Sequence, residues 1–264
     1  MLRLVLLSLA ATNALNLFPW QKFGQNLVDK KVQNLQKRII SINKSSSTFD
    51  LESIESEWLP RFDNSSGYDE DFILDESTST KESIGEGDTY GEILPSSMRV
   101  IINNFMTLTS DDIMYDLGSG VGKIVAQFAY ETECGKCIGI EIGELRHSEA
   151  VHVLKSLQQQ GSDNSIKKTN HPSNKIELRK GDCTKLFWGD ATVLFINALC
   201  FPADVWDQVE ILIRDSCPNL RYLMIGGQQL KEETEAKLQM RKSVVSSPAS
   251  WADDYICFLY TKPT

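Results

Sequence analysis

The sequence predicts an α/β fold in which a Rossmann-like sheet is covered by helices on both faces. A short apolar strand at residues 113–115 leads into a glycine-rich turn at 116–122, and a helical pattern follows the turn. Strand, glycine turn and helix begin a nucleotide-binding βαβ unit. A second apolar strand ends on Glu141, and further apolar runs alternate with helical patterns to the end of the chain. This alternation is typical of a mainly parallel sheet.

The other elements are predicted from hydrophobic spacing. Helices are expected at residues 95–106, 146–160 and 205–217, and a polar loop at 161–174. Strands are expected at residues 137–141, 176–179, 191–196 and 221–225, with a closing antiparallel pair near 244–245 and 255–260. The run at 191–196 is continuously apolar, which marks a central strand that is buried on both faces. With the first strand, these runs give a sheet of seven strands.

The glycine turn separates three classes of ligand by its spacing. It reads Asp116-Leu117-Gly118-Ser119-Gly120-Val121-Gly122, and Lys123 follows. A dinucleotide fingerprint would place its third glycine at position 123, and a P-loop would need a glycine at 117 and a Ser or Thr after the lysine. An acidic residue followed by G-x-G-x-G instead resembles motif I of the S-adenosylmethionine (SAM) methyltransferases. A glycine-rich turn without a ligand is the alternative.

Two carboxylates and one amide follow predicted strands, at the edge where open α/β sheets bind ligands. Glu141 lies 25 residues beyond Asp116, where such sheets place the carboxylate that binds ribose hydroxyls. Asp182 comes after the third strand and Asn197 ends the fourth. We expect Asn197 to face the ligand site; the alternative is a helix cap, a role that Asn favours.

Composition and charge bound the possible partners. The chain has 264 residues and a formal net charge of −9, and residues 49–88 carry thirteen acidic and only two basic side chains. The folded domain that follows is also slightly acidic. Binding to a phosphate backbone draws on clustered Lys and Arg, so the sequence gives no support for a nucleic-acid partner.

The cysteines predict neither a disulfide framework nor a metal site. All six lie after residue 133, and Cys134-Gly135-Lys136-Cys137 is a C-x-x-C without a second pair. We therefore expect no metal. The interpretation we favour is two small residues that lead into a strand, and a redox pair is the alternative.

The chain divides into four predicted segments. Residues 1–20 have a basic start, an apolar run too short to span a bilayer and small residues near Ala14, which favours a signal or targeting segment over a buried helix. Residues 21–48 are basic and could form an amphipathic helix or part of a plastid transit peptide. Residues 49–88 are expected to be a mostly disordered acidic linker, and the folded domain occupies 89–264. These features predict the secretory pathway or a plastid, with no transmembrane helix.

Four stretches of the chain resemble one family. They are Tyr90-Gly91-Glu92, the turn at 116–122, residues 193–197 with Phe201, and Ser250-Trp251 with Tyr255. The family is the disruptor-of-telomeric-silencing type of histone H3 lysine methyltransferase, which lacks a SET domain, and the resemblance covers about residues 88–262. It implies a seven-stranded class I methyltransferase sheet with SAM as the cofactor. Methyl transfer is then an in-line attack on a sulfonium methyl and needs no metal.

The resemblance also implies roles for particular residues. Those expected to close over the methionine part of the cofactor are Tyr90, Gly91, Glu92 and Ile93. Those expected to wrap its amino-acid end are Asp116, Gly118, Ser119, Gly120, Gly122 and Lys123. Glu141 would bind the ribose, and Asp182 and Cys183 would flank the adenine. Asn197 is the candidate catalytic residue, because its carbonyl oxygen can orient a neutral amine.

The sequence thus favours a SAM-dependent methyltransferase that acts on a protein lysine or another amine. By resemblance the substrate is histone H3 and the compartment the nucleus, and we expect a monomer. Ile93, Lys123 and Ala198 depart from the family, which has Thr, Gln and a second Asn there. Because that second Asn faces the methyl-transfer site in the family, we expect nucleosomal H3 to be a poor substrate. The alternative function is a domain of the same fold that binds SAM or a partner without turnover.

Overall fold

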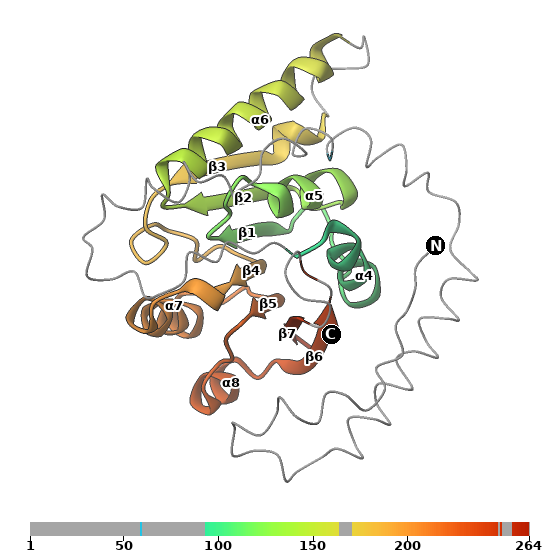
Figure 1. The fold of residues 1–264 in the computed structure, drawn as a ribbon. Helices are drawn as coiled ribbons and strands as arrows, with labels where there is room; N and C mark the ends of the chain where they lie inside the picture. Colours follow the sequence, from blue (N-terminus) through green and yellow to red (C-terminus); the bar gives the residue numbers. More distant parts are fainter. Residues whose placement is uncertain (1–58, 60–92, 164–170, 248, 250–254, 264) are drawn as a thin grey trace, which may run out of the picture. The chain divides into compact units, whose positions relative to one another are not determined.

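The computed structural model describes Leu59 and residues 93–163, 171–247, 249 and 255–263 (Figure 1). All of them belong to one compact unit, residues 52–264. Several predictions fall outside the described residues. These are the segments at 1–20 and 21–48, the linker at 49–88 apart from Leu59, and the predicted family residues Tyr90, Gly91, Glu92 and Trp251. Within the described ranges no helix is long and apolar enough to cross a membrane.

The sheet has seven strands in the order β3-β2-β1-β4-β5-β7-β6, which confirms the predicted class I methyltransferase fold. The strands are β1 (Ile113–Leu117), β2 (Lys136–Glu141), β3 (Ile176–Lys180), β4 (Val193–Asn197), β5 (Tyr222–Gly226), β6 (Arg241–Ser247) and β7 (Tyr255–Thr261). The first five run parallel, and β7 is antiparallel to both β5 and β6. The parallel strands therefore end together at one edge of the sheet, where β7 begins.

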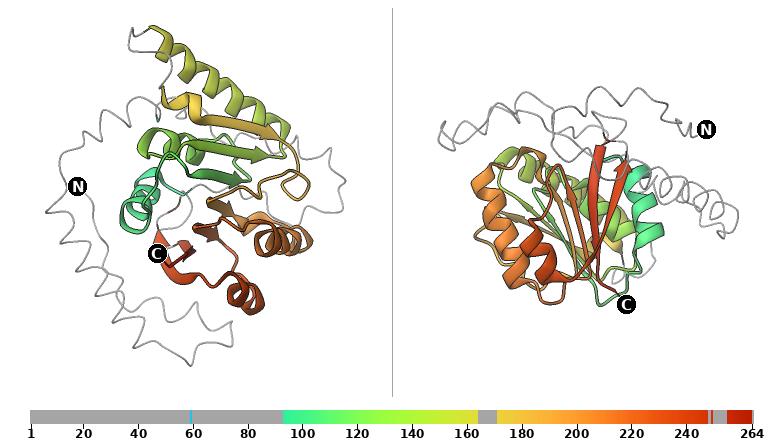
Figure 2. Two further views of the ribbon diagram at one scale, coloured as in Figure 1. Left: turned by 180° about the vertical axis from the view of Figure 1, so that it is seen from behind. Right: turned by 90° about the horizontal axis from the view of Figure 1, so that it is seen from below.

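Helices cover the two faces of the sheet (Figure 2). One face carries α4 (Pro95–Phe105), α5 (Lys123–Glu131) and α6 (Glu144–Asp163). The other carries α7 (Ala203–Ser216) and α8 (Glu232–Leu238). Two 3-10 turns, η4 (Pro172–Lys175) and η5 (Ala198–Cys200), precede β3 and follow β4. Each face has its own cluster of buried apolar side chains.

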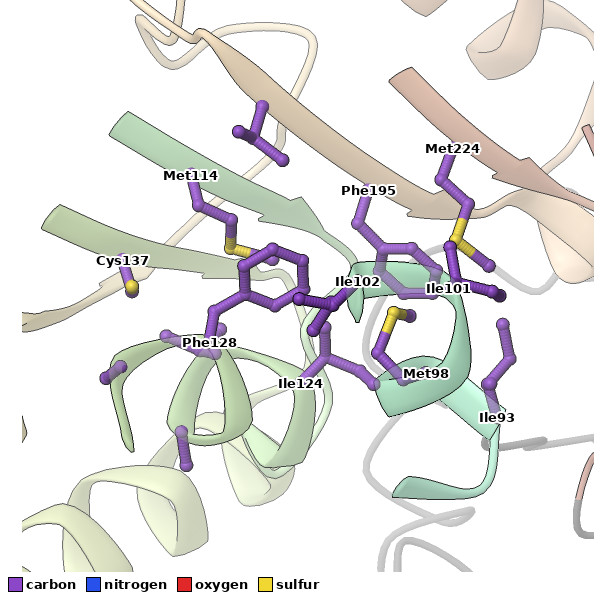
Figure 3. Packing of buried hydrophobic residues seen from close by; sticks show 14 of the residues in the cluster. Ile93, Met98, Ile101, Ile102, Met114, Ile124, Phe128, Cys137, Phe195 and Met224 are labelled. Carbon is purple, nitrogen blue, oxygen red and sulfur yellow. The ribbon is translucent and has the colours of Figure 1, made fainter. Parts of the chain in front are cut away.

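The α4 side of the core joins helix and strand residues that are far apart in the sequence (Figure 3). Met98 and Ile101 of α4 pack with Phe128 of α5 and with Phe195 and Met224 from the central strands. Their spacing along α4 is the helical period that predicted this buried face. A proline at the first helical position, Pro95, suits the start of α4 because its missing N–H needs no partner there.

Two elements differ from the sequence predictions. Helix α8 was not predicted, because its seven residues include three glutamates and only Thr234 is buried, so they show no apolar periodicity. Helix α6 continues to Asp163, three residues into the expected polar loop. The other predicted elements agree with the observed bounds to within three residues.

The edge of the sheet where the parallel strands begin is fixed by a hydrogen-bonded carboxylate. Asp112 is 1% exposed and accepts from the Thr109 N–H at 2.8 Å, the Thr192 hydroxyl at 2.8 Å and the Arg221 guanidinium at 2.6 and 2.7 Å. These contacts join the starts of β1, β4 and β5. Burial would raise the pKa of Asp112, but the hydrogen bonds and the charge of Arg221 outweigh it and lower the pKa below its ordinary value.

We expect Arg221→Met to lower the free energy of unfolding by about 2 kcal/mol at neutral pH, because the buried carboxylate then loses its charged donor. A carboxyl group with a lowered folded-state pKa stabilises above its unfolded pKa, and that stability is lost as pH falls through the folded value. The difference between the natural protein and the variant should therefore shrink below about pH 4. Urea unfolding at neutral and acidic pH measures both effects.

The control is Arg214→Met, which breaks the exposed pair of Arg214 and Asp215. Exposed ion pairs contribute little to stability, so this variant should unfold at nearly the natural urea concentration. An equal loss in the two variants would contradict a special role for Asp112.

Candidate functional site

Three predicted site residues meet at the edge where the parallel strands end. Leu117, the last residue of β1, is in register with Ile140 of β2 and Ile196 of β4. Asp116 comes just before Leu117, and Glu141 and Asn197 end the two neighbouring strands, so all three lie at the same edge of the sheet. Figure 1 shows β1 and β2 ending side by side. Open α/β sheets bind their ligands at this edge.

The glycine turn has the backbone conformation that its glycines predict. Gly118, Gly120 and Gly122 have φ values of 82°, 53° and 88°, in the left-handed region that side chains disfavour. The N–H groups of Gly118 and Ser119 donate to the Ile140 carbonyl at 2.8 and 3.0 Å, which fixes the turn to the end of β2. Lys123 then begins α5. The turn therefore reaches the site edge at the N-terminal end of a helix.

Asp116 has a buried oxygen atom without a partner. The residue is 2% exposed, and its Oδ1 atom has no hydrogen-bond partner among the described residues. Burial, followed by the negative charge of Glu141, raises the pKa of Asp116 well above its ordinary value. Buried polar atoms are normally hydrogen-bonded, so an orphaned carboxylate oxygen at this edge fits a ligand that brings a donor. The ammonium group of SAM is such a donor.

Glu141 is also buried, but its carboxylate is hydrogen-bonded. It is 4% exposed and accepts from the Gly120 N–H at 2.8 Å and the Gly143 N–H at 2.7 Å. Arg146 donates to it as well, at 3.1 Å. The predicted ribose acceptor therefore lies directly against the glycine turn.

The predicted adenine residues lie beside Glu141, but with local contacts. The Gly181 N–H donates to the Glu141 carbonyl at 2.9 Å, which holds the segment after β3 next to β2. Asp182 accepts from the Thr184 N–H at 2.8 Å and forms an ion pair with Lys185 at 2.8 Å. Burial would raise the pKa of Asp182, and these contacts outweigh it and lower the pKa. Burial raises the pKa of the Cys183 thiol to about 12, so the thiol stays neutral.

Asn197 accepts a hydrogen bond that sequence reasoning missed. The Tyr255 hydroxyl at the start of β7 donates to Asn197 Oδ1 at 2.7 Å. Gly226 lies between them, and a Cβ there would come within 2.6 Å of the Tyr255 oxygen. The side chain of Asn197 makes no cap hydrogen bond to η5, so the cap alternative is not what the fold uses. Tyr255 was part of the family pattern but was not assigned to the site.

The Tyr255 hydroxyl is held as a donor. Burial, with smaller contributions from Cys257 and Cys200, raises its pKa above the ordinary value of a tyrosine. The phenol therefore stays protonated throughout the neutral range. Asn197 and Tyr255 thus form a polar pair at the same sheet edge as Asp116 and Glu141.

Three further predicted residues surround this edge. Ile93 is buried and pairs with Ala249 in an isolated antiparallel bridge, close in sequence to β7. Ser119 is buried in the turn. Ala198 is 0% exposed and belongs to the apolar cluster on the α7 side, so its methyl group faces the core.

The cysteines and the acidic side chains form no other recognisable centre in the described part of the chain. All six cysteines are free thiols, and only Cys200 is exposed. Among the described residues, no group of three or more His, Cys, Asp or Glu side chains is arranged to hold a metal ion.

The chain is similar to a known protein family and to two of its characterised relatives. Residues 77–243 match the family described as "Histone methylation protein DOT1". A Caenorhabditis elegans histone-lysine N-methyltransferase, H3 lysine-79 specific, is 31% identical over 121 residues, which are 44% of this chain and 12% of the relative. The Kluyveromyces lactis enzyme of the same name is 30% identical over 129 residues, 47% of this chain and 22% of the relative. The chain thus matches only a small part of these relatives.

The solved structures with a similar arrangement include methyltransferases of low sequence identity. The methyltransferase domain of a bacterial CtHen1 is 8% identical, covers 64% of this chain and 97% of its own, and has a TM-score of 0.47. An RNA methyltransferase from Salinibacter ruber, solved with S-adenosyl-L-homocysteine, is 20% identical, covers 64% and 91%, and has a TM-score of 0.42. The family match confirms the predicted family of histone methylation proteins.

We predict that replacing Gly120 weakens SAM binding in proportion to the size of the new side chain. Its φ of 53° disfavours any Cβ, and its N–H donates to Glu141, so both the turn and the ribose acceptor should be disturbed. Gly120→Ala should weaken binding modestly and Gly120→Val by at least about tenfold. Calorimetry with SAM measures this, with circular dichroism as a check of the fold. Undiminished affinity of the Val variant would refute the placement of the cofactor.

We also predict that SAM binding releases a proton from Asp116. The raised pKa keeps a proton on the free carboxyl, whereas a carboxylate is needed to pair with an ammonium group. Affinity should therefore increase with pH by up to about tenfold per unit until the raised pKa is reached. Titration calorimetry in buffers of different ionisation enthalpy counts the protons released.

Asp116→Asn should abolish the proton release and weaken binding. If the natural protein binds SAM with no net proton release between about pH 5 and 8, Asp116 does not hold the ammonium group in this way.

Proposed function

Because the chain belongs to the DOT1 family of histone methylation proteins, we propose that it transfers a methyl group from SAM to a lysine side chain of a protein. The observation that carries the proposal is the arrangement of one sheet edge. The glycine turn with the unpartnered Asp116 oxygen lies at the ends of β1 and β2, and the Asn197–Tyr255 pair follows on β4 and β7.

The residues at the ends of β1 and β2 would bind the cofactor. The orphaned Asp116 oxygen would accept from its ammonium group, and the turn would lie against its amino-acid end. Glu141 Oε2 accepts a single N–H, from Gly120, so it has a lone pair left for a ribose hydroxyl. Asp182 and Cys183 are adjacent and would border the adenine. When bound, SAM supplies a methyl group on a sulfonium centre.

Asn197 at the end of β4 and Tyr255 at the start of β7 would orient the amine that accepts the methyl group. A lysine amine attacks only as the neutral base, and its remaining N–H groups need acceptors. Asn197 Oδ1 accepts a hydrogen bond from Tyr255, and an amide oxygen can accept more than one. The Tyr255 contact also sets which way the amide faces, with its oxygen toward the hydroxyl. The contribution of these residues is alignment, which requires reacting atoms about 3–3.5 Å apart.

The proposed methyl acceptor differs from the acceptor for which the relatives are named. Their names specify lysine 79 of histone H3. Here Ala198 stands where the family has a second Asn, and its side chain is buried among apolar groups. We therefore propose a protein lysine as the substrate class and expect nucleosomal H3 to react slowly. A histone acceptor would place the chain in the nucleus, whereas the predicted targeting segment at 1–20 favours another compartment.

Ala198 also supports a second candidate function, binding of SAM without turnover. The two functions differ in one assay. Radiolabelled SAM should transfer its methyl group to protein in nucleosomes, free histones or a cell extract if the chain is an enzyme. Measured SAM affinity with no labelled product in any of the three would favour the second function.

We predict that Tyr255→Phe slows methylation by about ten- to a hundredfold while SAM affinity changes by less than about twofold, because one hydrogen bond at a desolvated site contributes about 1–3 kcal/mol. The hydroxyl acts on Asn197 and not on the cofactor half of the edge. The measurement pairs initial rates on the best acceptor with calorimetry.

Tyr222→Phe is the matched control, because that hydroxyl contacts Thr107 before β1, at the opposite edge of the sheet. It should lower stability slightly and leave the rate unchanged. A Tyr255→Phe enzyme with the natural rate would remove the Asn197–Tyr255 pair from the mechanism.

A further inference from the structure

The carboxylate of Glu141 is held from two sides by different elements. Its Oε2 atom accepts from the Gly120 N–H of the glycine turn at 2.8 Å. Its Oε1 atom accepts from the Gly143 N–H at 2.7 Å and from two guanidinium nitrogens of Arg146, at 3.1 and 3.3 Å. One oxygen is thus directed to the turn, and the other is anchored to the start of α6.

In the described part of the chain, the groups near the Glu141 carboxylate are acidic or uncharged, except for Arg146. Asp116 at the end of β1 is a second buried carboxyl group, and Glu141 contributes to its raised pKa. His147 and Cys183 also face the charge of Glu141, and both are kept uncharged chiefly by burial. Lys180, the register partner on β3, forms its ion pair with Glu144 instead. Among the described residues, Arg146 is the cation in contact with the Glu141 carboxylate.

The position of Arg146 is unfavourable by itself. It lies in the first turn of α6, where the helix dipole disfavours a positive charge. Its side chain is only 14% exposed, so the guanidinium has also given up much of its hydration. The backbone is shaped to permit the contact, since a Cβ on Gly143 would lie 2.8 Å from an Arg146 nitrogen and 3.0 Å from Glu141 Oε1.

We propose that Arg146 is a positioning residue for the cofactor, which fixes the Glu141 carboxylate so that Oε2 faces the glycine turn and can accept a ribose hydroxyl. Without the guanidinium, Oε1 would keep a single backbone donor, and the carboxylate would be free to rotate. This inference rests on the proposed function only in taking SAM as the ligand, and it is independent of the methyl acceptor.

Calorimetry with SAM tests the proposal on the full-length chain. Arg146→Met, which keeps a long side chain but removes the charge and the donors, should weaken SAM binding about tenfold. Arg146→Lys should recover part of that loss, because an ammonium keeps the charge but lacks the two-nitrogen contact. Gly143→Ala should displace the guanidinium while it keeps its charge, and should weaken binding less than Arg146→Met.

A double-mutant cycle separates positioning from direct contact or a change in the fold. Glu141→Gln alone should weaken SAM binding. In that background, adding Arg146→Met should cost less than about a further twofold, because Arg146 acts through the Glu141 carboxylate. Thermal unfolding without cofactor shows that each variant is folded at the assay temperature.

Arg221→Met is the control for loss of an arginine partner from a buried carboxylate, since Arg221 pairs with Asp112 at the opposite edge of the sheet. It should lower the unfolding temperature without changing SAM affinity by more than about twofold. The proposal is overturned if Arg146→Met binds SAM within twofold of the natural protein, or if its effect is the same with and without Glu141. Absence of SAM binding by the natural protein would overturn the cofactor itself, whereas binding without lysine methylation would overturn only the proposed acceptor.

Discussion

Two buried carboxyl groups at the ends of adjacent parallel strands are the constraint on which the site depends. Asp116 and Glu141 are 2% and 4% exposed, and burial together with the negative charge of Glu141 raises the pKa of Asp116. The fold stabilises only one of them fully, since backbone N–H groups and Arg146 satisfy Glu141 while an oxygen of Asp116 is left unpartnered. A cationic ligand would relieve this imbalance. The unpartnered Asp116 oxygen, at the edge where such sheets bind ligands, thus fits a site for a ligand that brings a donor.

The opposite edge of the same sheet shows what a purely structural carboxylate looks like. Asp112 is as deeply buried as Asp116, but every donor around it is already in place, and its pKa is lowered where that of Asp116 is raised. The two aspartates lie at the two ends of β1, four residues apart in the sequence. Both side chains are almost inaccessible to solvent, but burial raises the pKa of Asp116, whereas hydrogen bonds and the charge of Arg221 outweigh burial at Asp112. Asp112, with its donors in place, supports the fold, and Asp116 is available to a ligand.

The sequence predicted that Asp116, the glycine turn and Glu141 lie at one edge of the sheet, and this arrangement was predictable because these residues are close in the sequence. A strand, a glycine turn and a strand-ending acid lie within one βαβ unit, and their spacing carries the information. The Asn197–Tyr255 contact could not be predicted in this way, because it joins residues 58 apart and depends on β7 inserting between β5 and β6. The contact of Arg146 with Glu141 is local in the sequence, but it was not predicted either. As a polar residue near a helix start it looks like a solvated side chain, and only the fold turns it back onto Glu141.

The division of the site edge between β1–β2 and β4–β7 has a consequence for how such a domain changes its substrate. The residues proposed to hold the cofactor depend on left-handed glycines and buried carboxylates, where substitutions are expected to weaken binding. The residues proposed to orient the acceptor come from β4 and β7, and Ala198, which by resemblance stands at a polar position of the family, packs in the apolar core. Acceptor preference can therefore drift while the cofactor site is retained. A chain of this family that keeps its glycine turn and the Glu141–Arg146 contact but alters the residue beside Asn197 is therefore expected to retain SAM binding while its acceptor changes.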